Sequence, residues 1–283
     1  LKIDKDKRQE LYDLLRFIAS NDRSTQVQMQ GGSWLDFFPT KKVKITVDKQ
    51  AVLNSGTVPE EKADEIAKTM SWNIRKGTLM KADLVVLDII ATNAKNGWER
   101  PIYWAITTGT DAYINMMPYL QMEGLTYRLV PIRKDDRIDN DGQPGRVDTE
   151  IMYANVLEDF TWGGLEYEED MWVDFVMMRQ CKNFRNIFVR LAYKMMMESR
   201  VAEQEVNFAE ATTGSSDGID KSLIKTKLSQ AVEVLDKGLR YIPEHLVPYD
   251  AYMVQYSQLY YQLGEIDKAY KLDSKIAEYL ISE

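Results

Sequence analysis

The two side chains best suited to nucleophilic or metal chemistry, cysteine and histidine, occur once each. Cys181 lies in the string RQCKNF, and His245 lies in YIPEHLVP between two prolines. A nucleophile with its base, or a set of thiolate and imidazole ligands, would have to use these two residues. A single cysteine also permits no intramolecular disulfide and no cysteine-based metal site. We expect Cys181 to be a buried or half-buried thiol and His245 to face solvent in a linker.

Carboxylates offer two weaker possibilities for chemistry. The loop RIDNDG puts Asp139 and Asp141 at the third and fifth positions of a calcium-binding loop, with a glycine after them. Its first ligand would be Arg137, whose positive charge opposes a cation, so the sequence favours a solvated turn. Asp83 and Asp88 lie five residues apart and do not form a convergent acid/base pair on a helix. We predict no catalytic residue, no metal site and no cofactor.

The string NGWERPIYWAITTGTD, residues 96–111, combines tryptophans, an arginine and a polar turn. It lacks the glycine spacing of a dinucleotide-binding loop and the Gly-Lys-Ser/Thr of a P-loop, although a helix N-terminus there could bind an anion. In the simpler interpretation, the tryptophans pack in a core and the turn caps a helix that begins near residue 112. The alternative is contact with a ligand or partner. The candidates for the cap are Thr108, Thr110 and Asp111, and those for ligand contact are Trp98, Arg100, Thr108, Thr110 and Asp111.

Tyrosines are numerous near the C-terminal end of the chain, over residues 249–261. Some of these rings must pack between helices. Others could line a concave groove of the kind that helical repeats use to bind peptides, because tyrosine provides contact area at low entropic cost. The candidates for such a groove are Tyr252, Tyr256 and Tyr260.

The composition limits the classes of function. The 283 residues suffice for two domains, and a hydrophobic content of 45% supports a core. A net charge of −8 without a basic stripe argues against nucleic acid as a partner. The run LVVLDIIA is too short and too interrupted to cross a membrane. Because the chain begins with Leu1, we expect a segment of a longer protein.

The first part of the chain mixes helix and strand patterns. Apolar residues with helical spacing predict a helix over 4–22, capped by Asp4 or Asp6. Alternation predicts a strand over 41–48, and Pro59 followed by acidic residues predicts a helix that stops at Gly77. For residues 80–97 a buried helix is favoured over a strand. Further strands are expected at PIYWAIT and GLTYRLVPI, and a further helix at TEIMYANVLEDF, which TWGG breaks.

From about residue 168 only helical patterns occur, and they contain a repeat. Two copies follow the tetratricopeptide pattern of apolar and small positions; generic helical hairpins are the alternative. The first copy is interrupted by an insertion over about residues 201–227, which includes the string EATTGSSDGIDKS, expected to be a flexible polar loop. The positions that fit are Phe188, Leu191, Ala192, Met195, Ser199, Ala231, Leu235, Gly238 and Pro243 in one copy, and Met253, Tyr256, Ser257, Tyr260, Gly264, Ala269 and Ile276 in the other, whereas Asp273 does not fit. We therefore expect an α+β domain over 1–166 and an all-α, tetratricopeptide-like region over 167–283.

Several long strings together carry a resemblance to one family. They are DKDKRQELYDLLRFIASND, FPTKKVKITVDKQAVLNSGTVPEE, NGWERPIYWAITTG, EGLTYRLVPI, GRVDTEIMYANV and FTWGGL. The chain resembles, over almost its whole length, the soluble C-terminal part of large multi-pass bacterial membrane proteins. That family has no established function and is related to protein O-mannosyltransferases and other C-type glycosyltransferases.

The resemblance implies a membrane region before this segment and a position on the periplasmic side of the bacterial inner membrane. It also implies that the catalytic acid and the lipid-donor site lie in that membrane part, so no family catalytic residue transfers to this chain. We expect a non-catalytic domain that binds an acceptor polypeptide or a protein partner. The alternatives are a stand-alone adaptor built on helical repeats, or a hydrolase or transferase with a pocket near residues 98–111.

Overall fold

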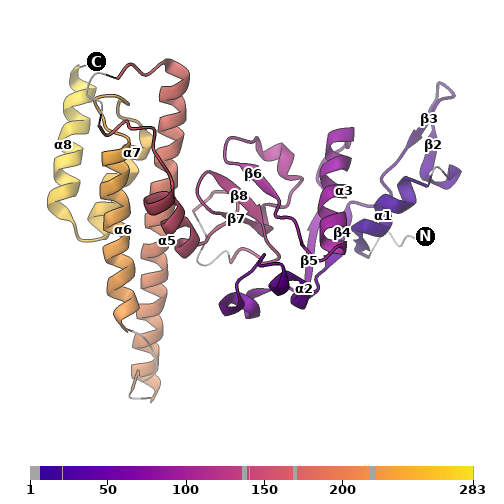
Figure 1. Ribbon diagram of the computed structural model, residues 1–283, viewed down its shortest axis with the longest axis horizontal. Helices are drawn as coiled ribbons and strands as arrows, with labels where there is room; N and C mark the ends of the chain where they lie inside the picture. The colour runs from indigo at the N-terminus through magenta and orange to yellow at the C-terminus, as the bar shows by residue number, and fades with distance from the viewer. Residues whose placement is uncertain are drawn as a thin grey trace. The chain divides into compact units, whose positions relative to one another are not determined.

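The computed structural model describes residues 7–20, 22–135, 139, 141–167, 171–213, 215–216 and 221–282. The chain divides into two compact units. The first comprises Leu1–Met122, Thr126–Asp135 and Gly142–Arg146, and the second comprises Glu123–Leu125, Asp136–Asp141 and Val147–Glu283. The first unit mixes strands with helices and the second is helical (Figure 1), which confirms the predicted fold class. The first unit ends at Arg146 and two short segments before it belong to the second unit, whereas the boundary expected from the sequence follows residue 166.

A three-stranded sheet forms the centre of the first unit. Its order is β1 (Gln9–Glu10), β4 (Lys42–Thr46) and β5 (Thr69–Asn73), with β1 parallel and β5 antiparallel to β4. The apolar side chains of β4 are buried and its terminal residues are exposed. This is the pattern expected of a strand with one face on a core, so the strand predicted over 41–48 is confirmed.

The helix predicted from Pro59 to Gly77 is wrong for most of its length. The structure has a 3-10 helix at Glu60–Glu65 and then the strand β5. Met70, Trp72 and Ile74 are buried, and polar residues separate them. That spacing has a period of two, which suits a strand and not a helix. Signals for a helix start do not say how far the helix extends, and here it ends after six residues.

Helix α1 (Leu11–Ile18) is shorter than predicted. Glu10 occupies its N-cap position and makes no side-chain cap bond; Asp4 and Asp6, the expected caps, lie outside the described residues. Leu11 and Leu14 are fully buried, and the helix packs against α3. The amphipathic pattern therefore predicted the buried face correctly but not the first residue.

Helix α3 (Lys81–Lys95) confirms the helix that was favoured for residues 80–97. Its first turn is closed by the Asp83 carboxylate, which accepts the Met80 backbone N–H at 2.8 Å. A short helix that was not predicted, α2 (Lys49–Asn54), begins where Asp48 accepts the backbone N–H groups of the two residues at 50 and 51.

The remaining strands of the first unit are short. A second sheet has the order β6-β8-β7-β9, and β2 pairs with β3 as a separate hairpin. The strands predicted at PIYWAIT and GLTYRLVPI are present as β6 and β8, whereas the other four were not predicted. The strands are β2 (Gln26–Gln28), β3 (Trp34–Asp36), β6 (Tyr103–Ala105), β7 (Leu120–Met122), β8 (Thr126–Leu129) and β9 (Arg146–Val147).

In the second unit, α4 (Thr149–Ala154) continues into a π-helical turn over Asn155–Asp159, which confirms the helix predicted there. Four longer helices follow. They are α5 (Phe175–Thr213), α6 (Lys221–Tyr241), α7 (Ala251–Gln262) and α8 (Ile266–Ser282). Helices α5 and α6 pack along each other, as do α7 and α8 (Figure 1).

The described residues of the insertion over about 201–227 are mostly helical, and the string EATTGSSDGIDKS, expected to be a flexible polar loop, is helical at both of its ends. Helix α5 continues to residue 213 and α6 already begins at residue 221. The segment contains several alanine, glutamate and glutamine residues, which are good helix formers. At its end, Lys227 is buried and its Nζ lies 2.8 Å from Thr149 Oγ1 and 3.1 Å from Glu198 Oε2. The insertion therefore lengthens the α5–α6 pair.

Small residues allow close helix contacts at the predicted positions. Ala192 and Ala231 are fully buried, and Gly238 lies against the rings of Phe188 and Tyr256. Asp273, which does not fit the repeat pattern, accepts hydrogen bonds from the hydroxyls of Ser257 and Tyr261. Aspartate is compatible with this position because its carboxylate oxygens accept these hydrogen bonds.

The connection between α6 and α7 is held by one buried arginine of α5. Arg185 donates through Nη1 to the Pro248 carbonyl at 2.8 Å and to Asp250 Oδ2 at 3.0 Å. Through Nη2 it donates to the carbonyls of Ile242 and Val247 at 3.2 and 2.6 Å. A connection without regular structure thus has its carbonyl groups satisfied from the neighbouring helix.

Candidate functional site

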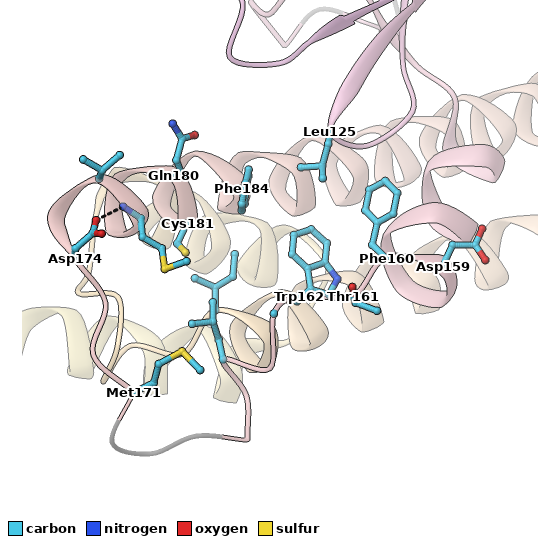
Figure 2. Close-up of a pocket in the computed structure, with 15 residues that line it drawn as sticks. Leu125, Asp159, Phe160, Thr161, Trp162, Met171, Asp174, Gln180, Cys181 and Phe184 are labelled. Atoms are coloured by element: carbon cyan, nitrogen blue, oxygen red, sulfur yellow. Dashed lines mark hydrogen bonds between the residues drawn. The ribbon is translucent and has the colours of Figure 1, made fainter.

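The second unit contains an apolar cavity of about 720 Å³ (Figure 2). Its lining comes from four places in the chain: residue 125, the segment that follows the π-helical turn, the start of α5, and the residue after α6. The lining residues are Leu125, Asp159, Phe160, Thr161, Trp162, Gly163, Leu165, Met171, Asp174, Val176, Met177, Gln180, Cys181, Phe184 and Ile242. All of them belong to the second unit.

The string FTWGGL forms a turn that contributes to the lining of this cavity. The helix ends at residue 159, as the TWGG break predicts. Gly163 and Gly164 have φ values of 72° and 77°, a region that side chains other than glycine rarely adopt. The turn buries Leu165 and leaves Phe160 close to Gly124, where an added Cβ would lie 2.6 Å from the Phe160 ring.

Aromatic rings form one side of the cavity. The Trp162 indole stacks on Tyr241 at 5.9 Å between ring centroids, and its centroid lies 6.0 Å from Phe160, 6.1 Å from Phe184 and 5.0 Å from Phe188. Its Nε1–H donates to the Val156 carbonyl at 3.0 Å. The hydrogen bond and the stacking hold the indole in place. Figure 2 shows Phe160, Trp162 and Phe184 along the same side of the cavity.

The other side of the cavity opens at the start of α5. Asp174 caps this helix by accepting the Met177 backbone N–H at 2.8 Å, the dashed line in Figure 2. The lining residues Val176 and Met177 are also exposed to solvent. Next to them in the chain, Trp172 is 82% and Phe175 is 77% exposed. Exposed apolar side chains in one place mark an interaction surface more often than single ones do.

The polar groups that line the cavity include two carboxylates, a thiol, a threonine hydroxyl and a glutamine amide. Among the described residues that line it there is no histidine, lysine or arginine. Cys181 is 4% exposed, so the predicted buried thiol is confirmed. Burial raises the pKa of this thiol, and the nearby Arg185 opposes the shift only in part. A protonated thiol without a base is a poor nucleophile, and the arrangement favours binding over covalent chemistry.

Cys181 is expected to react slowly with iodoacetamide at neutral pH, because both its burial and its raised pKa reduce the available thiolate. As the chain has no other cysteine, the mass increase of the intact protein measures this reaction directly. The rate should rise with pH as the thiolate forms, and it should be much faster in urea. A folded-state rate equal to that of the unfolded chain would contradict this expectation.

The loop that was considered for calcium has a different role. Lys194 Nζ lies 2.5 Å from Asp139 Oδ1, and Arg190 Nε lies 2.7 Å from Asp141 Oδ2. The expected solvated turn is therefore wrong for these two carboxylates, because both cations belong to α5 and the pairs are largely buried. Arg137 lies outside the described residues. No group of three or more potential ligands converges within the part of the chain that the structure describes.

None of the candidates of residues 96–111 is among the described residues that line this cavity. Trp98 and Trp104 are buried, as the packing interpretation predicts. The predicted cap is wrong: the 3-10 helix that begins at Thr110 has Gly109 at its N-cap and no side-chain cap bond. Arg100 and Thr110 are exposed, and Thr108 accepts the Tyr113 hydroxyl through its carbonyl. Ligand contact by this group stays a prediction.

Asp111 and Asp83 share one partner in the first unit. Lys76 Nζ lies 2.7 Å from Asp83 Oδ1 and 2.7 Å from Asp111 Oδ2. The two hydrogen bonds that Lys76 donates raise the pKa of its ammonium, the bond to Asp111 most. Asp88 is exposed while Asp83 is buried, so these two do not converge, as predicted.

Two of the three tyrosine candidates pack in the core, as one of the two alternatives predicts. Tyr256 and Tyr260 are fully buried, whereas Tyr252 is half-buried. The Tyr260 hydroxyl donates to Asp236 Oδ1 at 2.8 Å. Only Tyr252 retains surface for a partner. His245 is exposed, as expected for the linker histidine.

Apart from Cys181, which the sequence indicated as a buried thiol, no cavity residue was singled out as a site candidate. The available signal was the string MWVDFVMM after FTWGGL, where aromatic and apolar residues accumulate without regular alternation. A run of this kind at the start of a helix is more apolar than one buried face requires. It could have marked this end of α5 as a surface for a partner.

Comparison with known proteins bears mainly on the first unit. The family model described as TMEM260-associated domain 2 matches residues 2–151. No curated protein and no solved structure shows a significant match. Within the described residues, no helix has both the length and the apolar character needed to cross a bilayer. Apart from Leu125, the residues that line the cavity lie beyond the matched segment.

Proposed function

Because the chain belongs to the family of TMEM260-associated domain 2, which its match over residues 2–151 shows, we propose that it is a non-catalytic domain of a membrane-anchored protein. The parent would be a glycosyltransferase-like protein of the bacterial inner membrane, with this domain on the periplasmic side. Its helical unit would bind a polypeptide, either an acceptor or a partner, near the membrane site.

Two observations support the membrane-anchored parent. The family description names an association with TMEM260, and it gives no activity to the domain itself. The strings quoted above resemble the C-terminal part of multi-pass membrane proteins related to C-type glycosyltransferases. The tetratricopeptide-like spacing of the last four helices is consistent with a binding role, since such helices present concave surfaces to peptides.

The cavity of the second unit is the single observation that carries the binding role. Its volume of about 720 Å³ falls within the range of roughly 300–1,000 Å³ typical of ligand sites. Trp172 and Phe175, which neighbour lining residues in the chain, are largely exposed. An enclosed small ligand would leave these side chains in water, whereas a polypeptide would cover them.

A stand-alone adaptor is the second candidate, and the packed helices favour it. Met253, Ser257 and Ala269 are buried at the positions that the repeat pattern requires. Both proposals assign binding to the cavity, but they differ in whether the domain belongs to a membrane-anchored protein. An upstream reading frame that encodes many membrane spans supports the first, and a gene that encodes none supports the adaptor.

Loss of the full-length gene is expected to change the set of glycosylated surface proteins, and the wild-type gene should restore it. The variant Thr161→Trp introduces an indole at an exposed residue that lines the cavity. This variant should restore the set of glycosylated surface proteins less well than the wild-type gene. The matched control is Thr212→Trp, because Thr212 is exposed on α5 and does not line the cavity. The readout is the glycoprotein profile of whole cells.

Two outcomes would contradict different parts of this proposal. An unchanged profile after loss of the gene would remove the transferase role of the parent. Equal restoration by wild type and Thr161→Trp, at matched protein levels, would remove the cavity from the function.

A further inference from the structure

Resting on the proposed function, we infer that the cavity selects a basic amphipathic segment of a protein: an aromatic or branched apolar anchor flanked by lysine or arginine. The anchor would enter the apolar part of the cavity. The flanking cations would face the carboxylates of Asp159 and Asp174 at its edge.

The interior of the cavity suits an apolar anchor. The rings of Phe160, Trp162 and Phe184 face it together with the aliphatic side chains of Leu165 and Ile242. Trp162 already has its Nε1–H bonded to a backbone carbonyl, so the indole needs no polar partner from a ligand. Apolar and aromatic side chains buried in such a site dominate the affinity of most protein interfaces.

Among the described lining residues, the charged groups are all carboxylates. Asp159 and Asp174 are exposed and line the site. No lysine, arginine or histidine is among the described lining residues. The Arg240 guanidinium, on the helix that ends just before Ile242, is paired with Glu166 at 2.7 Å. A negative potential at an apolar opening attracts a cation next to an apolar group.

The same charges argue against a membrane surface as the occupant. Trp172 and Phe175 would suit a lipid interface, but the cytoplasmic and many bacterial leaflets carry anionic headgroups that attract basic segments. Carboxylates at the opening and a net charge of −8 oppose that attraction. The observations therefore favour a basic polypeptide over a lipid surface.

Calorimetry with designed helical peptides tests this inference on the whole 283-residue chain. Three peptides share one face of leucine and tryptophan and carry lysine, glutamine or glutamate on the opposite face. We expect the lysine peptide to bind most tightly and the glutamate peptide least tightly. Salt should weaken the lysine peptide more than the glutamine peptide, because it screens exposed charges.

The double variant Asp159→Asn/Asp174→Asn should weaken the lysine peptide about three- to tenfold, the range for two exposed ion pairs, and leave the glutamine peptide unchanged. Asparagine at position 174 can still cap α5. The control is Glu203→Gln/Glu205→Gln, which removes the same charge from exposed positions of α5 outside the cavity. Thr161→Trp should weaken the lysine and glutamine peptides equally.

The outcomes separate the two proposals. Equal affinity for the lysine and glutamine peptides, unchanged by the asparagine substitutions, would overturn the preference for basic segments and leave the binding role intact. No measurable binding of any peptide would overturn both. Binding to vesicles of anionic lipid that strengthens in the asparagine variant would identify the surface as a membrane contact and also overturn the inference.

Discussion

Arg185→Leu is expected to lower the free energy of unfolding by about 3–5 kcal/mol, the usual loss when one partner of a buried ion pair is removed. The arginine is 1% exposed and makes four hydrogen bonds to the connection between α6 and α7. Leucine fills part of the volume but donates nothing. Three backbone carbonyls and the Asp250 carboxylate would then lose a donor in a dry environment, which costs more than an ordinary exposed hydrogen bond.

The loss should extend beyond the connection itself. Asp250 also caps α7 by accepting the backbone N–H groups of Tyr252 and Met253 at 2.8 and 3.2 Å. A carboxylate released from Arg185 would be less well held for this role. We therefore expect α7 and α8 to loosen first, which amide hydrogen exchange of the two helices would detect.

Urea unfolding followed by far-UV circular dichroism measures the effect of Arg185→Leu. The control is Arg179→Leu, because Arg179 is an exposed arginine of the same helix. Arg185→Lys should fall between wild type and Arg185→Leu, since one ammonium cannot reach all four acceptors. If Arg185→Leu is no less stable than Arg179→Leu, the buried arginine does not hold the helical unit together.

Gly238→Val is expected to lower the free energy of unfolding by about 3 kcal/mol, at the upper end of the range for overpacking. A Cβ added at Gly238 would lie 2.3 Å from the Tyr256 hydroxyl and 2.8 Å from Phe188 Cγ. Glycine inside a helix usually costs about 1 kcal/mol relative to alanine. Its presence within α6 is explained by the close approach of the two rings.

Tyr256→Phe should partly rescue this variant, because it removes the nearest atom. Among the described residues the buried Tyr256 hydroxyl has no hydrogen-bond partner, so Tyr256→Phe alone should change stability little. The double variant should then lose less than the sum of the single losses, and this coupling is what a double-mutant cycle measures. Rescue stays incomplete because Phe188 remains close.

The control for Gly238→Val is Ala277→Val, which introduces the same side chain at an exposed position of α8. Strictly additive losses in the cycle would mean that the Tyr256 hydroxyl is not the obstacle. A Gly238→Val protein as stable as the control would mean that α6 can move away from α7 at no cost.

Local sequence patterns correctly predicted the buried residues of elements in which burial follows from spacing within the element. The alternation of β4 and the apolar face of α1 follow from short-range spacing, because a strand or helix at a core must bury one face. The exposed His245 and the buried Cys181 follow from composition and neighbours. The end of the helix predicted from Pro59 could not be found in this way. The signals at Pro59 describe only a first helical turn, and β4, the strand with which β5 pairs, lies elsewhere in the chain.

The candidate site shows the limit of such patterns. Tyr256 and Tyr260 have the same residue type and helical spacing as Tyr252. Only the packing of α7 against α5 and α8, and the contact of these two hydroxyls with α6, makes them core residues. Asp139 and Asp141 resemble cation ligands until α5 supplies Lys194 and Arg190.

From the residues alone, the chain has an α+β region followed by helices, a net charge of −8, and one cysteine and one histidine. Those properties depend on composition and on spacing within single elements. The cavity depends on segments around residues 125, 160, 176 and 242, which only the folded chain brings together. Local periodicity indicates which face of a single element is buried, but long-range packing decides which segments meet and which further apolar and charged side chains are covered.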